Sequence, residues 1–264
     1  MSWLRLMEEH IKREHEHPHR NGGDPTRKRK NRVMALIAEM WPAYLIEILV
    51  IILGIWVSLG LEQWRDNARE DKLEKVYEKN LLRDINTDMV SLNGCERNTA
   101  NLLMGGRELA KFIANPSAMK LSPDKATNDL QMVLGRPKFL TSDATFSDLK
   151  SSGNLHLLKN IHLKNLLFSY YSTAQGIKEM QDAEQQATIT VTGPYFFKHF
   201  DLSSAGKPIS QQELQTLLND REFSNNLQLR IHNREELARS YLGADSLAKE
   251  IRKELGGPAD DYPE

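Results

Sequence analysis

The sequence has very little cysteine. Cys95 stands alone among 264 residues, so the chain cannot form an internal disulfide, and this residue matches no spacing of metal ligands. The formal net charge is only −1, and the basic residues concentrate ahead of the long apolar stretch rather than along the rest of the chain. This balance gives no support to nucleic-acid binding.

Sequence patterns of catalytic and cofactor sites are also missing. Gly105-Gly106 follows no predicted strand and lacks the lysine-serine/threonine pair of a phosphate loop. Ser151 and Ser152 lack the Gly-x-Ser-x-Gly arrangement of a strained nucleophile elbow. We therefore assign no catalytic, cofactor-binding or metal-binding residue, and an enzyme is the most remote of the functions considered.

The first 40 residues are predicted to form a cytoplasmic segment. Apolar residues at helical spacing favour a short amphipathic helix on the membrane surface: Trp3, Leu4, Met7 and Ile11. Nearby histidines have the chemistry of zinc or nickel ligands: His10, His15, His17 and His19. Because Pro18 and the Asn-Gly-Gly-Asp-Pro run over 21–25 favour a segment without fixed ligand geometry, we predict no specific metal binding.

Residues 41–61 are predicted to form a single transmembrane helix. The stretch is apolar for about the length that an α-helix needs to cross a hydrocarbon core of roughly 30 Å. Aromatic residues that favour the headgroup layer lie at or near its ends: Trp41, Tyr44, Trp56 and Trp64. No small-residue cleavage pattern comes after the stretch, so we interpret it as an uncleaved signal anchor.

Basic residues just before this stretch predict its orientation. They are Arg27, Lys28, Arg29, Lys30 and Arg32. An excess of lysine and arginine marks the cytoplasmic side of a membrane helix. The N-terminus is therefore expected in the cytoplasm, and everything after Leu61 on the far side, which is the periplasm for a protein of a bacterial inner membrane.

Glu47 is the unusual residue of the apolar stretch, because a carboxylate within a membrane is energetically costly. It shares a helix face with Gly54 and Ser58, whose small-xxx-small spacing allows two helix backbones to approach closely. Glu47, Gly54 and Ser58 are thus a candidate transmembrane interface with a second copy or another membrane protein. Two alternatives stay open: Glu47 snorkels to the cytoplasmic interface, or it serves a proton or ion pathway.

Residues 62–256 are predicted to form an extracytoplasmic helical bundle, with a flexible tail over 257–264. Apolar residues at steps of four or three favour an outward continuation of the membrane helix: Leu73, Tyr77, Leu81, Ile85, Met89 and Leu92. Asn93-Gly94 is the expected bend or end of that helix, and 95–113 the expected second helix. Because no alternating strand pattern of useful length appears, the fold class is predicted to be all-α.

Capping residues predict where the later helices begin. The expected starts are Ser122, Thr141 or Ser142, Asn160, Ser210, and Asn219 or Asp220. The β-branched run before Gly193-Pro194 is expected to kink or end the long helix that Asn160 caps. Gly256-Gly257 is the expected terminator of the last helix.

A polar cluster within residues 145–171 predicts a corner between two helices. Gly153 is placed to end one helix and Asn160 to cap the next. We expect the hydroxyl of Tyr170 or Tyr171 to satisfy a turn carbonyl. The alternative is a ligand or peptide pocket at this corner, whose candidate residues are Ser151, Ser152, Gly153, Asn154, Tyr170 and Tyr171.

Two motifs together resemble a known family. The first is Glu47-Ile-Leu-Val-Ile-Ile-Leu-Gly-Ile-Trp56 with Trp64 downstream, and the second is Leu149-Lys-Ser-Ser-Gly-Asn154 followed by Tyr170-Tyr171. In this combination the chain resembles domain-of-unknown-function family 6090, over most of residues 40–175. The resemblance implies a bacterial single-pass membrane protein with a helical domain, and no established activity. The chain departs from the family in its longer histidine-rich N-terminus and in Ser58 and Gly60.

These patterns predict a function in binding rather than in catalysis. The leading hypothesis is a membrane-anchored extracytoplasmic interaction module, either sensor-like or scaffolding, whose partners are the lipid bilayer and a second copy or another membrane protein. The alternative is a homo-oligomer that uses Glu47 for ion or proton coupling.

Overall fold

The computed structural model describes residues 25–116, 120–200 and 207–257, with side chains from residue 41 onward except that of Ala43. All regular secondary structure in these ranges is helical, which confirms the predicted all-α class. The chain divides into two units, Met1–Asn67 and Ala68–Glu264, and each is described by itself. The predicted N-terminal amphipathic helix, the four N-terminal histidines and the tail from residue 258 lie outside the described residues.

The first described helix, α2 (Pro25–Ala114), is 90 residues long. The expected bend or end at Asn93-Gly94 is wrong, because the helix passes through both residues and includes the segment expected to be a second helix. Leu92 and Cys95 on either side are buried in the core. Glycine in a helix costs only about 1 kcal/mol relative to alanine, which the packing of these neighbours offsets.

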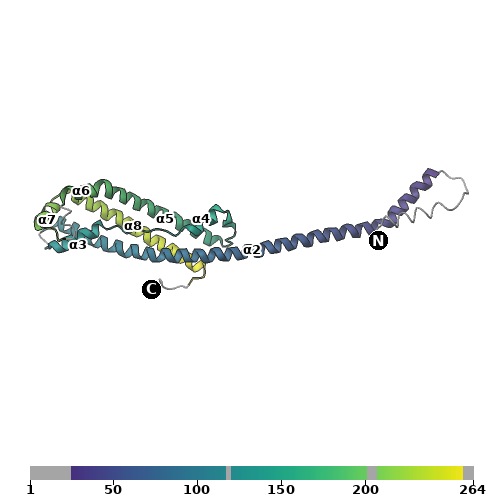
Figure 1. Ribbon diagram of the computed structural model, residues 1–264, viewed down its shortest axis with the longest axis horizontal. Helices are drawn as coiled ribbons and strands as arrows, with labels where there is room; N and C mark the ends of the chain where they lie inside the picture. The colour runs from purple at the N-terminus through teal and green to yellow at the C-terminus, as the bar shows by residue number, and fades with distance from the viewer. Residues whose placement is uncertain (1–24, 117–119, 201–206, 258–264) are drawn as a thin grey trace. The chain divides into compact units, whose positions relative to one another are not determined.

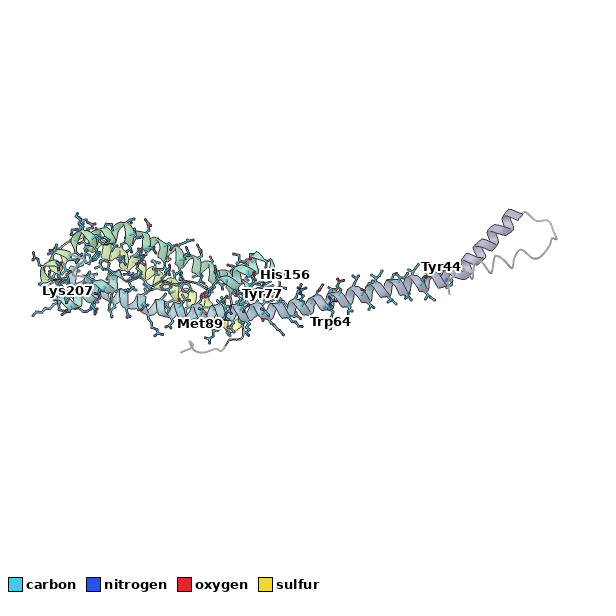
Figure 2. The ribbon with its side chains drawn as sticks, viewed as in Figure 1. Tyr44, Trp64, Tyr77, Met89, His156 and Lys207 are labelled. Carbon is cyan, nitrogen blue, oxygen red and sulfur yellow. The ribbon has the colours of Figure 1, made fainter. Side chains whose placement is uncertain are left out.

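Within the first unit, the apolar stretch of α2 is uncovered. Every described side chain from Tyr44 to Asn67 is exposed, and none of the most apolar window is buried. Figure 2 shows side chains projecting outward from the helix between the labelled Tyr44 and Trp64. Among the described residues this is one helix long and apolar enough to cross a membrane.

The main core of the second unit joins α2, α5 (Ile161–Ala187) and α8 (Arg221–Glu254). α5 and α8 run side by side along the part of α2 that follows Ala68 (Figure 1). α2 contributes most of the residues that its sequence predicts at steps of four and three: Tyr77, Leu81, Ile85, Met89 and Leu92. Leu73, the first of the predicted series, is instead 38% exposed. α4 (Ala144–Ser151) covers one end of this core with Phe146 and Leu149.

A second core lies at the other end of this unit. It is built by α3 (Pro123–Leu134), α6 (Gly193–His199) and α7 (Gln211–Leu218), together with the end of α2 and the start of α8. Its most buried side chains include Leu109, Ala126, Leu214 and Leu227. The buried apolar residues of α8 therefore divide between the two cores, with Phe223 and Leu227 in this core and Leu237 and Tyr241 in the first.

Most predicted helix starts are confirmed. The N-caps of α3, α5, α7 and α8 are Ser122, Asn160, Ser210 and Asp220, and Ser210 forms the predicted capping box with Glu213. The start expected at Thr141 or Ser142 is wrong, because α4 begins at Ala144. Thr141 and Ser142 instead donate hydrogen bonds to Asp88 of α2, which holds them outside the helix.

The β-branched run ends α5, as predicted. Thr188–Thr192 forms a π-helical turn, η2, between α5 and α6. Pro194 has no N–H to bond the carbonyl of Thr190, and its ring clashes with that carbonyl in a regular α-helix. The backbone N–H of Gly193 donates to the carbonyl of Thr188 across this wider turn, and the Thr188 hydroxyl donates to the carbonyl of Glu184 at 2.8 Å, a contact that often bends helices.

A buried charge cluster ties α8 to α5 and to the end of α3. The Glu184 carboxylate lies 3.2 Å from the Arg234 guanidinium and 3.7 Å from that of Arg230. Arg230 Nε donates to the carbonyl of Val133 at 3.0 Å, and Arg234 donates to that of Gly135 at 2.5 Å. Burial, followed by the charge of Arg230, lowers the pKa of Arg234 to about 10. Two buried cations therefore share one buried anion.

Replacing Glu184 with glutamine is expected to lower the free energy of unfolding by about 3 kcal/mol, because both guanidiniums stay buried without a counter-charge. Glu179→Gln, at an exposed position of the same helix, is expected to change it by less than about 0.5 kcal/mol. Denaturant unfolding of the full chain in detergent micelles, followed by circular dichroism, measures both. Equal losses in the two variants would contradict a stabilising role for this cluster.

Candidate functional site

The predicted corner is formed by α4 and the 3₁₀ turn η1 (Asn154–His156). The hydroxyls of Ser151 and Ser152 both donate to the carbonyl of Asp148, at 3.3 and 2.7 Å. Gly153 has a φ of +75°, in the left-handed region that glycine adopts without strain. The serines and the glycine are exposed, and they close the end of α4.

Asp88 of α2 is fully buried near the start of α4 and accepts three hydrogen bonds. The donors are the Thr141 hydroxyl, the Ser142 backbone N–H and the Tyr170 hydroxyl, each at 2.7 Å. They come from the segment before α4 and from α5. One carboxylate therefore joins both segments to α2, and these bonds offset the desolvation of its charge.

A second carboxylate of α2, Asp84, lies one turn away from Asp88. It accepts hydrogen bonds from the hydroxyl and the backbone N–H of Thr145, at 2.5 and 3.4 Å. Thr145 lies in the first turn of α4, where unpaired N–H groups and the helix dipole favour a negative charge. Asp143, the N-cap residue, makes no side-chain cap bond of its own. Asp84 thus caps α4 from a neighbouring helix.

The two predicted tyrosines have different surroundings. Tyr170 is fully buried with its hydroxyl on Asp88, whereas the Tyr171 hydroxyl donates to the carbonyl of Ser142 at 3.2 Å. The Tyr171 bond is the expected contact with a turn carbonyl. The pKa of each phenol is raised far above its usual value, mainly by burial and to a smaller extent by the charge of Asp88.

The end of the corner attaches to an earlier part of α2, before Asp84 and Asp88. Asn154 donates to the Tyr77 hydroxyl at 2.9 Å, and Tyr77 donates to the Asp148 carboxylate at 2.8 Å. The backbone N–H of Lys159 donates to Glu74 at 2.9 Å. These hydrogen bonds hold the corner against α2, so the polar groups that form them serve a structural role.

The corner lacks the contacts of a nucleophile and its base among the described residues. Ser151 and Ser152 bond the same backbone carbonyl, and the Nδ1 atom of His156 lies 2.9 Å from the carbonyl of Gly153. His162 lies 3.3 Å from Glu250 at the surface. No serine of this corner is paired with a histidine, so the geometry supports the structural interpretation of the signature.

A groove of about 600 Å³ lies beside the corner, between α4, α5 and the segment before α4. Of the predicted pocket residues, only Tyr171 lines it. Its other aromatic lining residues are Phe139, Phe146 and Phe168, and Leu140 is 65% exposed at its edge. Sequence reasoning missed Leu140, in the loop before α4, and Phe168 of α5; the signal that could have found them is a large apolar side chain outside the predicted core.

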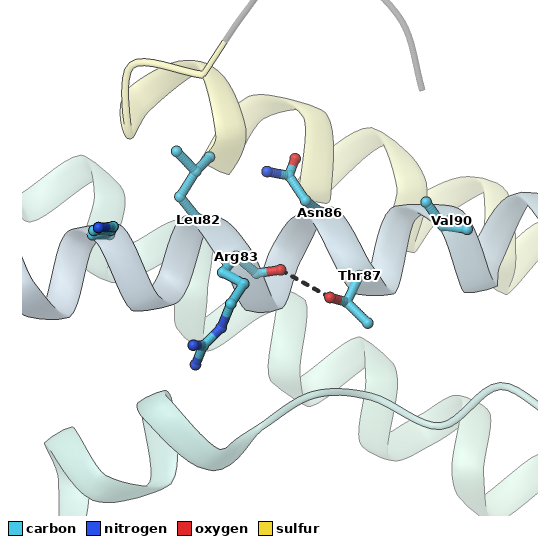
Figure 3. A pocket seen from close by; sticks show the side chains of 6 residues that line it. Leu82, Arg83, Asn86, Thr87 and Val90 are labelled. Atoms are coloured by element: carbon cyan, nitrogen blue, oxygen red, sulfur yellow. Dashed lines mark hydrogen bonds between the residues drawn. The ribbon is translucent and has the colours of Figure 1, made fainter. Parts of the chain in front are cut away.

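A second hollow, of about 380 Å³, lies on α2 alone (Figure 3). Its lining side chains are Lys79, Leu82, Arg83, Asn86, Thr87 and Val90. The Thr87 hydroxyl donates to the carbonyl of Arg83 at 3.0 Å, within the same helix. Because every lining residue comes from one helix, no groups converge on a ligand, and we assign no site there.

The predicted transmembrane interface lies on the uncovered part of α2. Glu47, Gly54 and Ser58 are all exposed, and a side chain added at Gly54 would meet nothing within 4 Å. They lie seven and four residues apart, which puts them on one side of the helix. This face is therefore open to close approach by another helix.

Comparisons with known proteins give no guide to function. No family model, no curated protein and no solved structure matches the chain. The residues of the corner, the groove and the membrane helix therefore carry the functional inference.

Tyr170 predicts an alkaline loss of stability. Its pKa is raised on folding from an ordinary value of 10.0, so the folded state retains a proton that the unfolded state loses. Stability is therefore fully present below pH 10 and falls above it, by about 1.4 kcal/mol per pH unit for this residue.

Tyr170→Phe is expected to make the fall in unfolding free energy with pH shallower by that amount between pH 10 and 11.5. Denaturant unfolding of the full chain in micelles at several pH values measures the slope. Removing the hydroxyl also lowers the unfolding free energy at neutral pH, but that loss does not vary with pH. The slope of unfolding free energy against pH therefore still reports the ionisation of Tyr170. An unchanged slope would show that Tyr170 ionises normally in the folded chain.

Proposed function

We propose that this chain is a membrane-anchored interaction module, sensor-like or scaffolding, with its helical unit on the extracytoplasmic side and no catalytic activity of its own. Its partners are the lipid bilayer and, through the membrane helix, a second copy or another membrane protein. The resemblance to domain-of-unknown-function family 6090 stays a prediction and points in the same direction.

The observation that carries this proposal is the uncovered apolar stretch of α2. Trp56 is 75% exposed and Val57 is 69% exposed, and their neighbours along the stretch are similar. A run this long and apolar is unfavourable in water, and a bilayer core of roughly 30 Å would cover it. We therefore propose that lipid surrounds the apolar stretch of α2.

The basic run over residues 27–32 supports the proposed orientation. Lysine and arginine on the N-terminal side favour retention of that side in the cytoplasm. On this basis we propose a bacterial inner-membrane location, with the unit Ala68–Glu264 in the periplasm.

Binding is favoured over catalysis by the way in which the corner uses its polar groups. The serines, Asn154 and both tyrosines form hydrogen bonds that close or attach the corner. An interaction surface needs shape and exposed apolar side chains instead, and the groove beside the corner offers both.

Ion or proton coupling is the second candidate, and Glu47 is the observation that favours it. Its carboxylate lies exposed within the apolar stretch, where an ionisable group commonly marks a partner or a pathway. An oligomer would bring several such carboxylates close together.

Topology tests the location directly. A reporter that is active only in the periplasm, fused after Glu264, is expected to be active in a bacterial host. Neutralising the basic residues is expected to weaken this bias; the changes are Arg27→Gln, Lys28→Gln, Arg29→Gln, Lys30→Gln and Arg32→Gln. A C-terminus in the cytoplasm would overturn both the orientation and the extracytoplasmic function.

Assembly tests the proposed interface. Gly54→Leu together with Ser58→Leu is expected to lower self-association in a membrane two-hybrid assay, because bulk prevents close backbone approach. Leu53→Ala, on another face, is the control and is expected to change it little. If the double variant associates as well as the parent chain, this face contacts lipid rather than a second copy.

Glu47→Gln separates the two candidate functions. Glutamine keeps the hydrogen bonding but cannot ionise or carry a proton. As an interface contact, Glu47 would tolerate glutamine but not leucine, both in self-association and in cellular phenotype. Normal assembly with a lost phenotype in Glu47→Gln would favour ion coupling instead.

A further inference from the structure

The groove beside the corner has a floor of packed aromatic rings. Phe146 stacks on Tyr171 with ring centroids 4.4 Å apart and meets the edge of Phe168 at 5.3 Å. Phe168 remains 46% exposed, and Leu140 extends the apolar surface from the segment before α4. These side chains would bury an apolar group without rearrangement, because the rings already hold one another in place.

Polar side chains from two helices also line the groove. Ser147 comes from α4, whereas Ser172 and Gln175 come from α5. Hydroxyl and amide groups match the N–H and C=O groups of a peptide backbone, which a hydrocarbon chain does not have. A peptide therefore fits this lining better than an acyl chain does.

The charges on the groove favour an acidic occupant at one end. Lys150 Nζ lies 5.5 Å above the Phe146 ring and forms no ion pair within the described part of the chain. Lys178 also lines the groove, but it is paired with Asp182 at 2.8 Å. Asp143 lines it seven residues before Lys150, at the opposite end of α4. The unpaired positive charge is thus confined to the C-terminal end of α4.

We propose that this groove binds a short peptide segment of a partner protein, in which an aromatic or branched aliphatic side chain stands next to a carboxylate. The apolar side chain packs on Phe146, Phe168 and Leu140, and the carboxylate pairs with Lys150. This inference rests on the proposed function as an interaction module and names the chemistry of the segment that it binds.

The test uses a library of random heptapeptides displayed on phage and selected against the full chain in lipid nanodiscs. Enriched sequences are expected to place Asp or Glu within two residues of Phe, Tyr, Leu or Ile. The most enriched peptide is then made with a fluorescent label, and its dissociation constant is measured by anisotropy. Lys150→Glu is expected to weaken binding about tenfold or more, and Leu140→Asp similarly.

Two control variants make the result specific. Lys150→Arg keeps the charge and is expected to bind within about threefold of the parent chain. Lys120→Glu makes the same charge change on an exposed residue outside the groove and is expected to leave binding unchanged. Circular dichroism checks that the helices of each variant are intact. All four substitutions are at exposed positions, so we expect the helical signal to be unchanged.

Three results would overturn the proposal. They are no enrichment over empty nanodiscs, enriched peptides without the acidic and apolar pair, and equal binding by Lys150→Glu. Displacement of the peptide by sodium dodecanoate below its micellar concentration would reassign the groove to an amphiphile. Each of these results would reject peptide binding without affecting the proposal of a membrane anchor. A cytoplasmic C-terminus in the topology assay would do the reverse: it would reject the extracytoplasmic function without affecting peptide binding to the groove.

Discussion

The buried carboxylate of Asp88 is the contact on which the arrangement around the corner depends. It receives hydrogen bonds from Thr141 and Ser142, which set where α4 begins, and from Tyr170, which fixes α5. A carboxylate without these donors would be unstable in a core, so its burial requires both the segment before α4 and α5 to be in place against α2. The position of the aromatic floor of the groove depends on the same contact. Tyr171 follows Tyr170 on α5, and Phe146 packs on Tyr171.

The sequence predicts much of the helical fold because the relevant signals are local. N-caps and apolar periodicity act over three or four residues, and Ser122, Asn160, Ser210 and Asp220 all cap as expected. Predictions failed where a distant contact outweighed a local preference. Asn93-Gly94 stays helical because core packing on both sides holds it, and α4 starts late because Asp88, more than fifty residues earlier, captures Thr141 and Ser142.

The candidate site was predictable only in part, for the same physical reason. The corner could be located from Gly153 and Asn160, and the hydroxyl contact of a tyrosine with a turn was expected. The groove could not be located from the sequence, because its lining comes from a loop and two helices that only tertiary packing brings together. The charge cluster of Glu184 with two arginines was missed likewise, since the partners are about fifty residues apart and look like surface residues of amphipathic helices.

The π-helical turn has a geometric consequence for the two cores. Ile177 and Tyr195 are eighteen residues apart, which is five whole turns of an α-helix, so an unbroken helix would direct both to the same side. The wider turn at Thr188–Thr192 takes up roughly one extra residue and rotates α6 about the helix axis by about 100°. Ile177 packs in the first core, and Tyr195, further along the helix axis and on the rotated α6, packs in the second. Deleting a single residue within this turn would change the angular phase of α6 and direct Tyr195 away from the core that it fills.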